Sequence, residues 1–177
     1  MKRFLLFHLS LFVFTISFTN AQGVLESPAL NAGFGFSGWG VPLYVGVDFP
    51  VHEAITIGGN LSYQSKTESQ SYFGYSVEWK HTIVGISGRG DYHFNELLDL
   101  PEEWDLYGGL SLGYWIWNTK YTDDFDAEYS GIGSGGLGIY FQAGGRYFFS
   151  DNVAVNIEVG GGNIMAGGRI GVTFLLQ

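Results

Sequence analysis

The chain contains no cysteine and only four prolines among its 177 residues. Without cysteine there is no disulfide, no thiolate metal site and no cysteine to carry a lipid, so in an oxidising compartment the fold must be held by its sheet alone. Charged residues are scarce at 14% of the chain, and 8 Lys and Arg stand against 17 Asp and Glu. This acidic balance argues against nucleic acid as a partner.

Long apolar runs are confined to the N-terminus. Residues 1–21 start with Lys2 and Arg3, continue through an apolar stretch to Phe18, and end on the small residue Ala21. This pattern is typical of a secretory signal peptide, with cleavage expected after Ala21. A membrane-anchoring helix fits less well, because the stretch is short and polar residues follow it at once. We therefore predict a signal peptide at residues 1–21 and one domain at residues 22–177.

The remainder of the chain favours β-structure, since 28 residues are glycine and 18% are aromatic. Eight segments alternate between apolar or glycine residues and polar, small or charged ones. They are residues 30–37, 41–49, 54–64, 76–94, 105–119, 135–149, 153–159 and 166–176. In hydrocarbon every backbone polar group must be paired. The sequence therefore predicts an all-β fold, an eight-stranded antiparallel transmembrane up-and-down β-barrel.

An even number of strands predicts short turns at the inner end of the barrel and longer loops at the outer end. Residues 65–75 and 120–134 are long and polar, and we expect them to be outer loops. The inner connection at residues 95–104 is longer than this rule predicts. Aromatic residues near the strand ends, among them Trp115 at the outer end, are expected to form two girdles at the membrane interfaces.

The polar faces of the predicted strands carry three cations and three anions. These residues are Arg89, Arg146, Arg169, Asp48, Asp91 and Glu158. An eight-stranded barrel is only wide enough to be filled by its own side chains, and buried charges are tolerated there when they are paired. We therefore predict an ion-paired lumen. The alternative is a narrow pore lined by the same residues, which would need an open axis.

In these features the chain resembles the small OmpA/OmpX-like outer-membrane barrel family, over about residues 23–177. The last strand, RIGVTFLL, is similar to the assembly signal of that family, with Arg169, Gly171, Phe174 and Leu176 at the signal positions. It departs from the family in ending on Gln177 instead of an aromatic residue. The resemblance implies the outer membrane of a Gram-negative bacterium, a monomer among outer-membrane lipids and lipopolysaccharide, and the assembly machinery as a transient partner.

Several motifs invite a chemical interpretation but have a simpler one. The tripeptide Arg89-Gly90-Asp91 spells an adhesion motif, yet alternation directs both charged side chains into the lumen. His93 is expected to cap the inner rim. His81, with Ser76 or Ser111, is the nearest approach to a catalytic pair, without a recognisable spacing.

We accordingly predict neither an enzyme nor a cofactor or metal site. The acidic residues of 122–130 are interpreted as a solvated loop, with weak divalent-cation binding as a minority hypothesis. The predicted role is structural or surface-interacting and adhesin-like, through residues 65–75 and 120–134. The alternatives are a lipid A-modifying acyl enzyme, a narrow pore, and a soluble lipocalin-like barrel with its apolar face inside.

Overall fold

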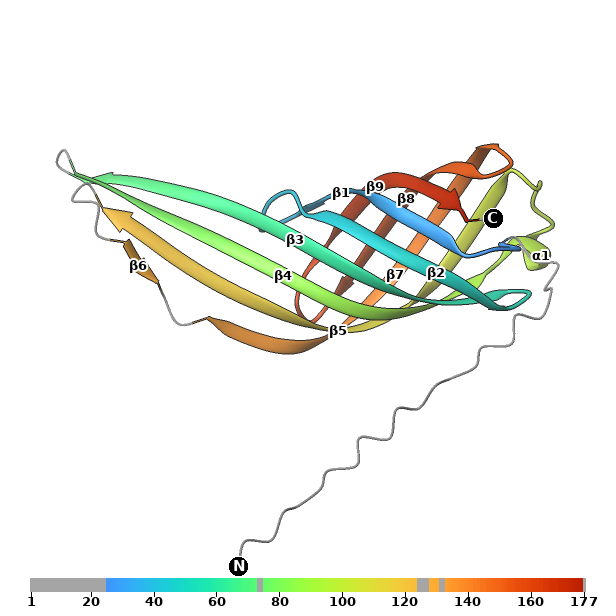
Figure 1. The fold of residues 1–177 in the computed structure, drawn as a ribbon, viewed down its shortest axis with the longest axis horizontal. Helices are drawn as coiled ribbons and strands as arrows, with labels where there is room; N and C mark the ends of the chain where they lie inside the picture. The colour runs from blue at the N-terminus through green and yellow to red at the C-terminus, as the bar shows by residue number, and fades with distance from the viewer. Residues whose placement is uncertain (1–24, 73–74, 124–127, 131–132, 177) are drawn as a thin grey trace, which may run out of the picture.

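A computed structural model describes residues 25–72, 75–123, 128–130 and 133–176 (Figure 1). The signal peptide expected at residues 1–21 and its cleavage site lie outside these ranges. Within them, no helix has the length and apolar character needed to cross a membrane.

The described residues form one antiparallel sheet that closes on itself. Its strands are β1 (Ala29–Ser37), β2 (Leu43–His52), β3 (Ile55–Tyr72), β4 (Tyr75–His93), β5 (Trp104–Asp123), β6 (Glu128–Ser130), β7 (Ser134–Ser150), β8 (Val153–Gly162) and β9 (Ala166–Leu175). The order is β4-β3-β2-β1-β9-β8-β7-β5-β6, and β4 also pairs with β5. Eight strands therefore make the wall, and β6 adds a short piece beside the end of β5. The predicted fold class is confirmed.

Closure depends on the pairing of the first strand with the last. β1 and β9 are in register over nine positions, from Ala29 opposite Leu175 to Ser37 opposite Gly167. Because every wall strand has a neighbour on both sides, the backbone N–H and C=O groups of the wall are satisfied within the sheet.

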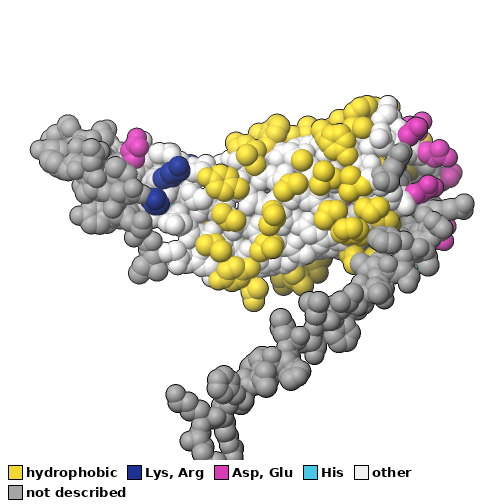
Figure 2. Space-filling view, viewed as in Figure 1, with side chains coloured by type: hydrophobic (Ala, Val, Ile, Leu, Met, Phe, Trp, Pro, Cys, Tyr) yellow, Lys and Arg dark blue, Asp and Glu magenta, His cyan; other side chains and the backbone are white. Residues whose placement is uncertain are grey.

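Alternation along each strand separates an apolar exterior from a polar interior. In β8, Val155, Ile157 and Val159 are 39%, 57% and 59% exposed, whereas Asn156 and Glu158 are buried. Figure 2 shows the apolar belt on the face in view, between the cationic and the acidic end of the barrel. A soluble lipocalin-like barrel would place these faces the other way round, so that alternative is wrong. An exterior of this kind is stable in hydrocarbon and not in water.

The long outer connections are shorter than predicted, because strands occupy most of them. β3 continues to Tyr72 and β4 starts at Tyr75, so residues 65–72 are paired strand and not loop. β5 likewise continues to Asp123, and β6 pairs with its end. The prediction failed because a strand with both faces in water needs no apolar alternation, so its signal resembles that of a polar loop.

The inner connection at residues 95–104 contains a four-residue helix, α1 (Asn95–Leu98). The Asn95 side chain fastens it to β5: its amide donates to the Trp104 carbonyl, and its oxygen accepts from the Leu106 N–H at 3.1 Å. Exposed acidic side chains gather at this end of the barrel (Figure 2), namely Glu96, Asp99, Glu102, Glu103 and Asp151.

A cation placed in the middle of the apolar belt should destabilise the barrel strongly. We expect Ile157→Arg to lower the free energy of unfolding by roughly 2–4 kcal/mol in lipid vesicles, because hydrocarbon surrounds this position. Phe149→Arg, at the inner end of β7, should cost about 0–1 kcal/mol, because that residue lies near an interface. Urea titrations of both variants measure the difference, and equal costs would contradict the position of the belt.

Candidate functional site

The six charged residues predicted for the lumen are all joined in one network. The Arg146 guanidinium donates to Asp48 Oδ2 at 2.5 Å, and Arg89 lies 3.7 Å from the other Asp48 oxygen. Arg89 Nε also donates to Asp91 Oδ2 at 2.6 Å. The strands β2, β4 and β7 supply these groups from separate parts of the wall, so the network crosses the barrel interior.

Glu158 holds the other half of the network together. Its Oε2 atom accepts hydrogen bonds from Arg89 at 2.9 Å, from Arg169 at 2.7 Å and from the Tyr107 hydroxyl at 3.1 Å. The Glu158 side chain is 2% exposed. A buried carboxylate is tolerable only with such compensation, and these three donors provide it.

The network extends toward the inner end through His93, which was expected at the inner rim, and through Asp105 and Thr56, which sequence reasoning missed. Arg146 donates to Asp105 Oδ2 at 2.9 Å, and Asp105 Oδ1 lies 2.6 Å from His93 Nδ1. His93 Nε2 is in turn 3.0 Å from Thr56 Oγ1. Asp105 precedes the inward-facing Tyr107 by two residues, so alternation along β5 puts both on one face and could have found Asp105.

Two tyrosine rings support the arginines. The guanidinium carbon of Arg146 is 4.7 Å from the centre of the Tyr107 ring, and that of Arg169 is 4.5 Å from the centre of the Tyr44 ring. A side chain at Gly144 would meet Tyr107 at 2.6 Å, and one at Gly171 would meet the Tyr44 hydroxyl at 2.4 Å. Glycine at these positions is therefore needed for the rings to lie against bare backbone.

Thr56, His93 and Asp105 form a hydroxyl–imidazole–carboxylate chain, an order also found in nucleophilic catalysts. Their exposed fractions are 2%, 3% and 0%, so a substrate has no access to the hydroxyl. Asp105 is also engaged by Arg146. The arrangement therefore fixes three inner strands to one another. Among the described residues, no group of His, Asp and Glu is placed to hold a metal ion.

The other sequence motifs do not come together as a reactive site. His81 Nδ1 lies 3.0 Å from Thr119 Oγ1, and Ser111 donates to Gln142 at 3.1 Å. The side chain of Ser76 and the acidic residues 123–128 lie outside the described side chains. The adhesion tripeptide is buried, because Arg89 and Asp91 bond to each other within the lumen.

The remaining predicted positions lie on the outer part of the wall and on the last strand. Trp115 is 6% exposed and faces the lumen, so its assignment to an interfacial girdle was wrong; it shares the inward face of β5 with Tyr107 and Ser111. Of the predicted assembly signal, Arg169 contacts Glu158 inside the barrel, whereas Phe174 and Leu176 are 44% and 45% exposed on the outside. Gly171 approaches Tyr44.

The geometry of this barrel is also found in proteins of known structure. No protein-family model matches the chain, and no curated protein matches its sequence. Solved structures do match. Ail, the attachment invasion locus protein of Yersinia pestis, solved with the heparin analogue sucrose octasulfate, has a TM-score of 0.52 at 10% identity, covering 84% of this chain and 95% of Ail. The chain has the fold of the small outer-membrane barrels.

A second barrel supports the same assignment. The N-terminal β-barrel domain of Pseudomonas aeruginosa OprF has a TM-score of 0.50 at 14% identity, covering 85% of this chain and 97% of that domain. At these identities the likeness concerns the path of the chain through the small outer-membrane barrel. The network in the lumen is a property of the present residues.

Breaking one buried ion pair should cost far more than breaking an exposed one. We expect Glu158→Gln to lower the free energy of unfolding by about 3–5 kcal/mol, because Arg89 and Arg169 would keep buried charges without their shared anion. Lys66→Ala removes the exposed pair with Glu68 and should leave the midpoint of unfolding nearly unchanged, because water screens that pair. Denaturant titration in lipid vesicles measures both, and a near-neutral Glu158→Gln would argue against the network as a source of stability.

Removing the outermost histidine should leave lipid A unchanged. His81 bonds to Thr119 and has no serine partner among the described side chains, so His81→Ala should not alter acyl modification. Mass spectrometry of lipid A from cells producing the wild type, the variant or neither tests this expectation. An acyl change that requires His81 would show that the barrel is an enzyme.

Proposed function

We propose that the protein is a monomeric outer-membrane barrel of a Gram-negative bacterium that acts in surface interaction through the protruding ends of β3, β4 and β5. The proposal includes a lumen that the buried ion network closes to conduction. The observation that carries this proposal is the unequal length of the strands. The wall ends early on one side, and β3, β4 and β5 continue beyond it (Figure 1).

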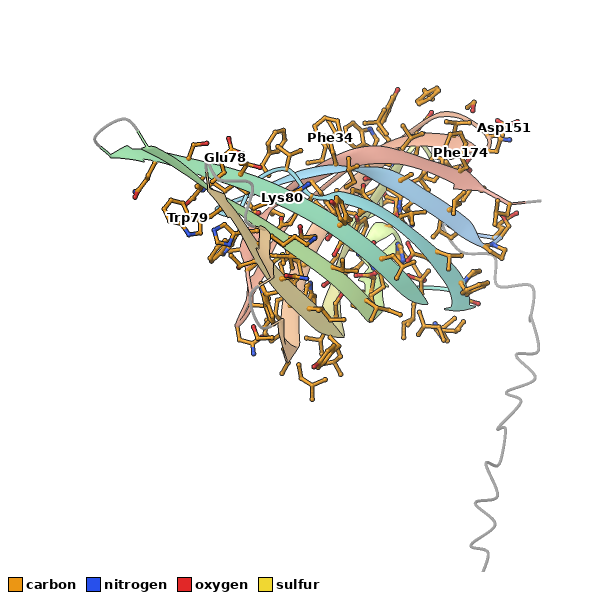
Figure 3. All side chains as sticks on the ribbon, turned by 60° about the vertical axis from the view of Figure 1, so that its left-hand side comes forward. Phe34, Glu78, Trp79, Lys80, Asp151 and Phe174 are labelled. Carbon is orange, nitrogen blue, oxygen red and sulfur yellow. The ribbon has the colours of Figure 1, made fainter. Side chains whose placement is uncertain are left out.

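The pairing register defines the protruding sheet. β2 pairs with β3 only as far as Leu43 opposite Tyr63, whereas β3 and β4 stay paired to Tyr72 opposite Tyr75. Residues 64–72 therefore extend past the last β2 partner, roughly 30 Å at the usual rise of a strand. Figure 3 shows Glu78, Trp79 and Lys80 on this part of β4, far from Asp151 at the opposite end of the barrel.

The protruding sheet has the chemistry of a surface exposed to water. Lys66 and Glu68 form an ion pair at 2.7 Å with exposures of 41% and 52%. Through its hydrogen bond and its charge, Lys66 lowers the pKa of Glu68. Lys80 and Lys120 face each other across β4 and β5. Outside the apolar belt, such cations are suited to the phosphates of lipopolysaccharide, which we propose as the lipid partner.

The outer part of β3 also presents a backbone edge. Within the described residues, β3 pairs only with β4 beyond Tyr63, so one row of its N–H and C=O groups points away from the sheet. An edge of this kind can bind an extended segment of another protein by strand addition. The charges of Lys66 and Glu68 limit edge-to-edge aggregation between copies of the chain.

The similarity of fold to Ail makes attachment the first activity to test. Ail is named as an attachment invasion locus protein and was solved with a heparin analogue. A shared fold does not carry a shared ligand, so the choice between protein and polysaccharide depends on the surface of this chain. Its free backbone edge favours a protein partner.

Shortening the protruding hairpin should abolish attachment without unfolding the barrel. We expect a variant in which residues 67–80 are replaced by Asn-Gly, which keeps Lys66 opposite His81, to lose about tenfold or more of the adhesion seen with wild-type cells, because strand addition would lose its edge. The assay counts bacteria of a non-adherent strain, producing either form, on an epithelial monolayer.

The control is the gel mobility of the outer-membrane fraction, boiled and unboiled in SDS, which should be heat-modifiable for both forms. Equal adhesion of the two forms, with the barrel intact, would overturn the proposed role of the hairpin. A soluble wild-type protein without a mobility shift would overturn the membrane assignment itself.

A further inference from the structure

The outer half of the lumen holds a cavity of about 80 Å³ above the ion network. Arg169, Glu158 and Tyr44 line its inner end, and Trp115 and Ile83 line its wall. Phe36, Pro42 and Met165, also among its lining residues, come from the outer ends of β1, the β1–β2 turn and the β8–β9 turn. The cavity is thus polar toward the network and apolar toward the outer end.

Several polar groups in this cavity have no partner. The side-chain nitrogen of Gln64 is buried without a hydrogen bond, and the residue as a whole is 3% exposed. The hydroxyls of Ser62, Ser87 and Tyr140 make no hydrogen bond within the described residues, and neither does the indole N–H of Trp115. Among the described residues that line the cavity, the Gln64 nitrogen is the polar atom that is both fully buried and unpaired, and buried polar groups are normally paired. Amide and indole nitrogens can only donate, so the missing partner must accept.

The charges in the cavity are already balanced. Arg169 Nη2 donates to Glu158 Oε2 at 2.7 Å, and Arg169 Nη1 lies 3.5 Å from Asn60 Oδ1. An anion beside Arg169 would meet Glu158, and a cation beside Glu158 would meet Arg169. Either charge would be buried without compensation.

We propose that this cavity is a binding site for a small neutral amphiphile, with a hydrogen-bond acceptor on a compact apolar body, of the class of short-chain amides. The acceptor lies against Gln64 and Trp115. The apolar body lies against Ile83 and points toward Pro42 and Met165. This site lies inside the barrel at the base of the protruding strands, where Gln64 is buried, and it does not depend on the attachment function.

The test uses the folded protein in phospholipid nanodiscs, with nitrogen-15 in its five tryptophans. The indole signal of Trp115 is assigned with Trp115→Phe, and butyramide is the probe. We expect a saturable shift of the Trp115 signal, while the signal of Trp104, near α1 at the opposite end, stays in place. Butyrate has nearly the same shape but carries a charge. It should bind about tenfold more weakly or worse, the factor expected from one uncompensated buried polar contact.

Variants locate the binding within the cavity. Ser62→Leu puts apolar volume into the cavity and should abolish the shift, whereas Thr67→Leu, an exposed change on the same strand, should leave it intact. Gln64→Met keeps the side-chain size but removes the amide donors, and should weaken butyramide about tenfold. It serves as the decisive variant if Ser62→Leu does not fold, as judged by heat-modifiable mobility.

Three results would overturn the proposal. They are an absent or non-saturable shift of Trp115, which means that water alone enters the cavity; butyrate binding as well as butyramide; and unchanged binding in folded Gln64→Met.

Discussion

Closure of the sheet by β1 and β9 is the constraint on which the rest of this structure depends. Once the first strand pairs with the last, no wall strand has a free edge, and the whole wall can face hydrocarbon with its backbone satisfied. The same closure creates an inside that is too narrow to stay open in eight strands. Side chains directed inward must then fill it and satisfy one another.

The ion network is the consequence of that second requirement. Arginines from β4, β7 and β9 reach carboxylates on other strands, and Glu158 and Asp105 each accept from more than one donor. Residues that look adhesive or catalytic in the sequence make structural contacts in this network. Arg89 and Asp91 of the adhesion tripeptide bond to each other, and His93 is held between Thr56 and Asp105. The network ends below the outer rim, where unpartnered donors surround the cavity.

The outer end differs from the rest because its strands leave the apolar belt at different heights. β1, β2, β8 and β9 are short, and β3, β4 and β5 continue into water. A three-stranded extension of this kind is held by its backbone ladder and by its attachment to the barrel, without an apolar face of its own. In the proposed function, interaction with other molecules takes place at the protruding strands, while the barrel supplies the rigid base.

The sequence by itself determined the barrel, its eight wall strands and the inward direction of all six predicted charges, because an alternation of period two reports which face each side chain occupies. Only the tertiary structure decided which charges meet: Asp105 and His93 join the network through partners far away along the chain, and Trp115 lines a cavity. The protruding strands were missed as well. Where both faces of a strand meet water, alternation disappears, and only pairing with the neighbouring strand distinguishes residues 65–72 from a loop.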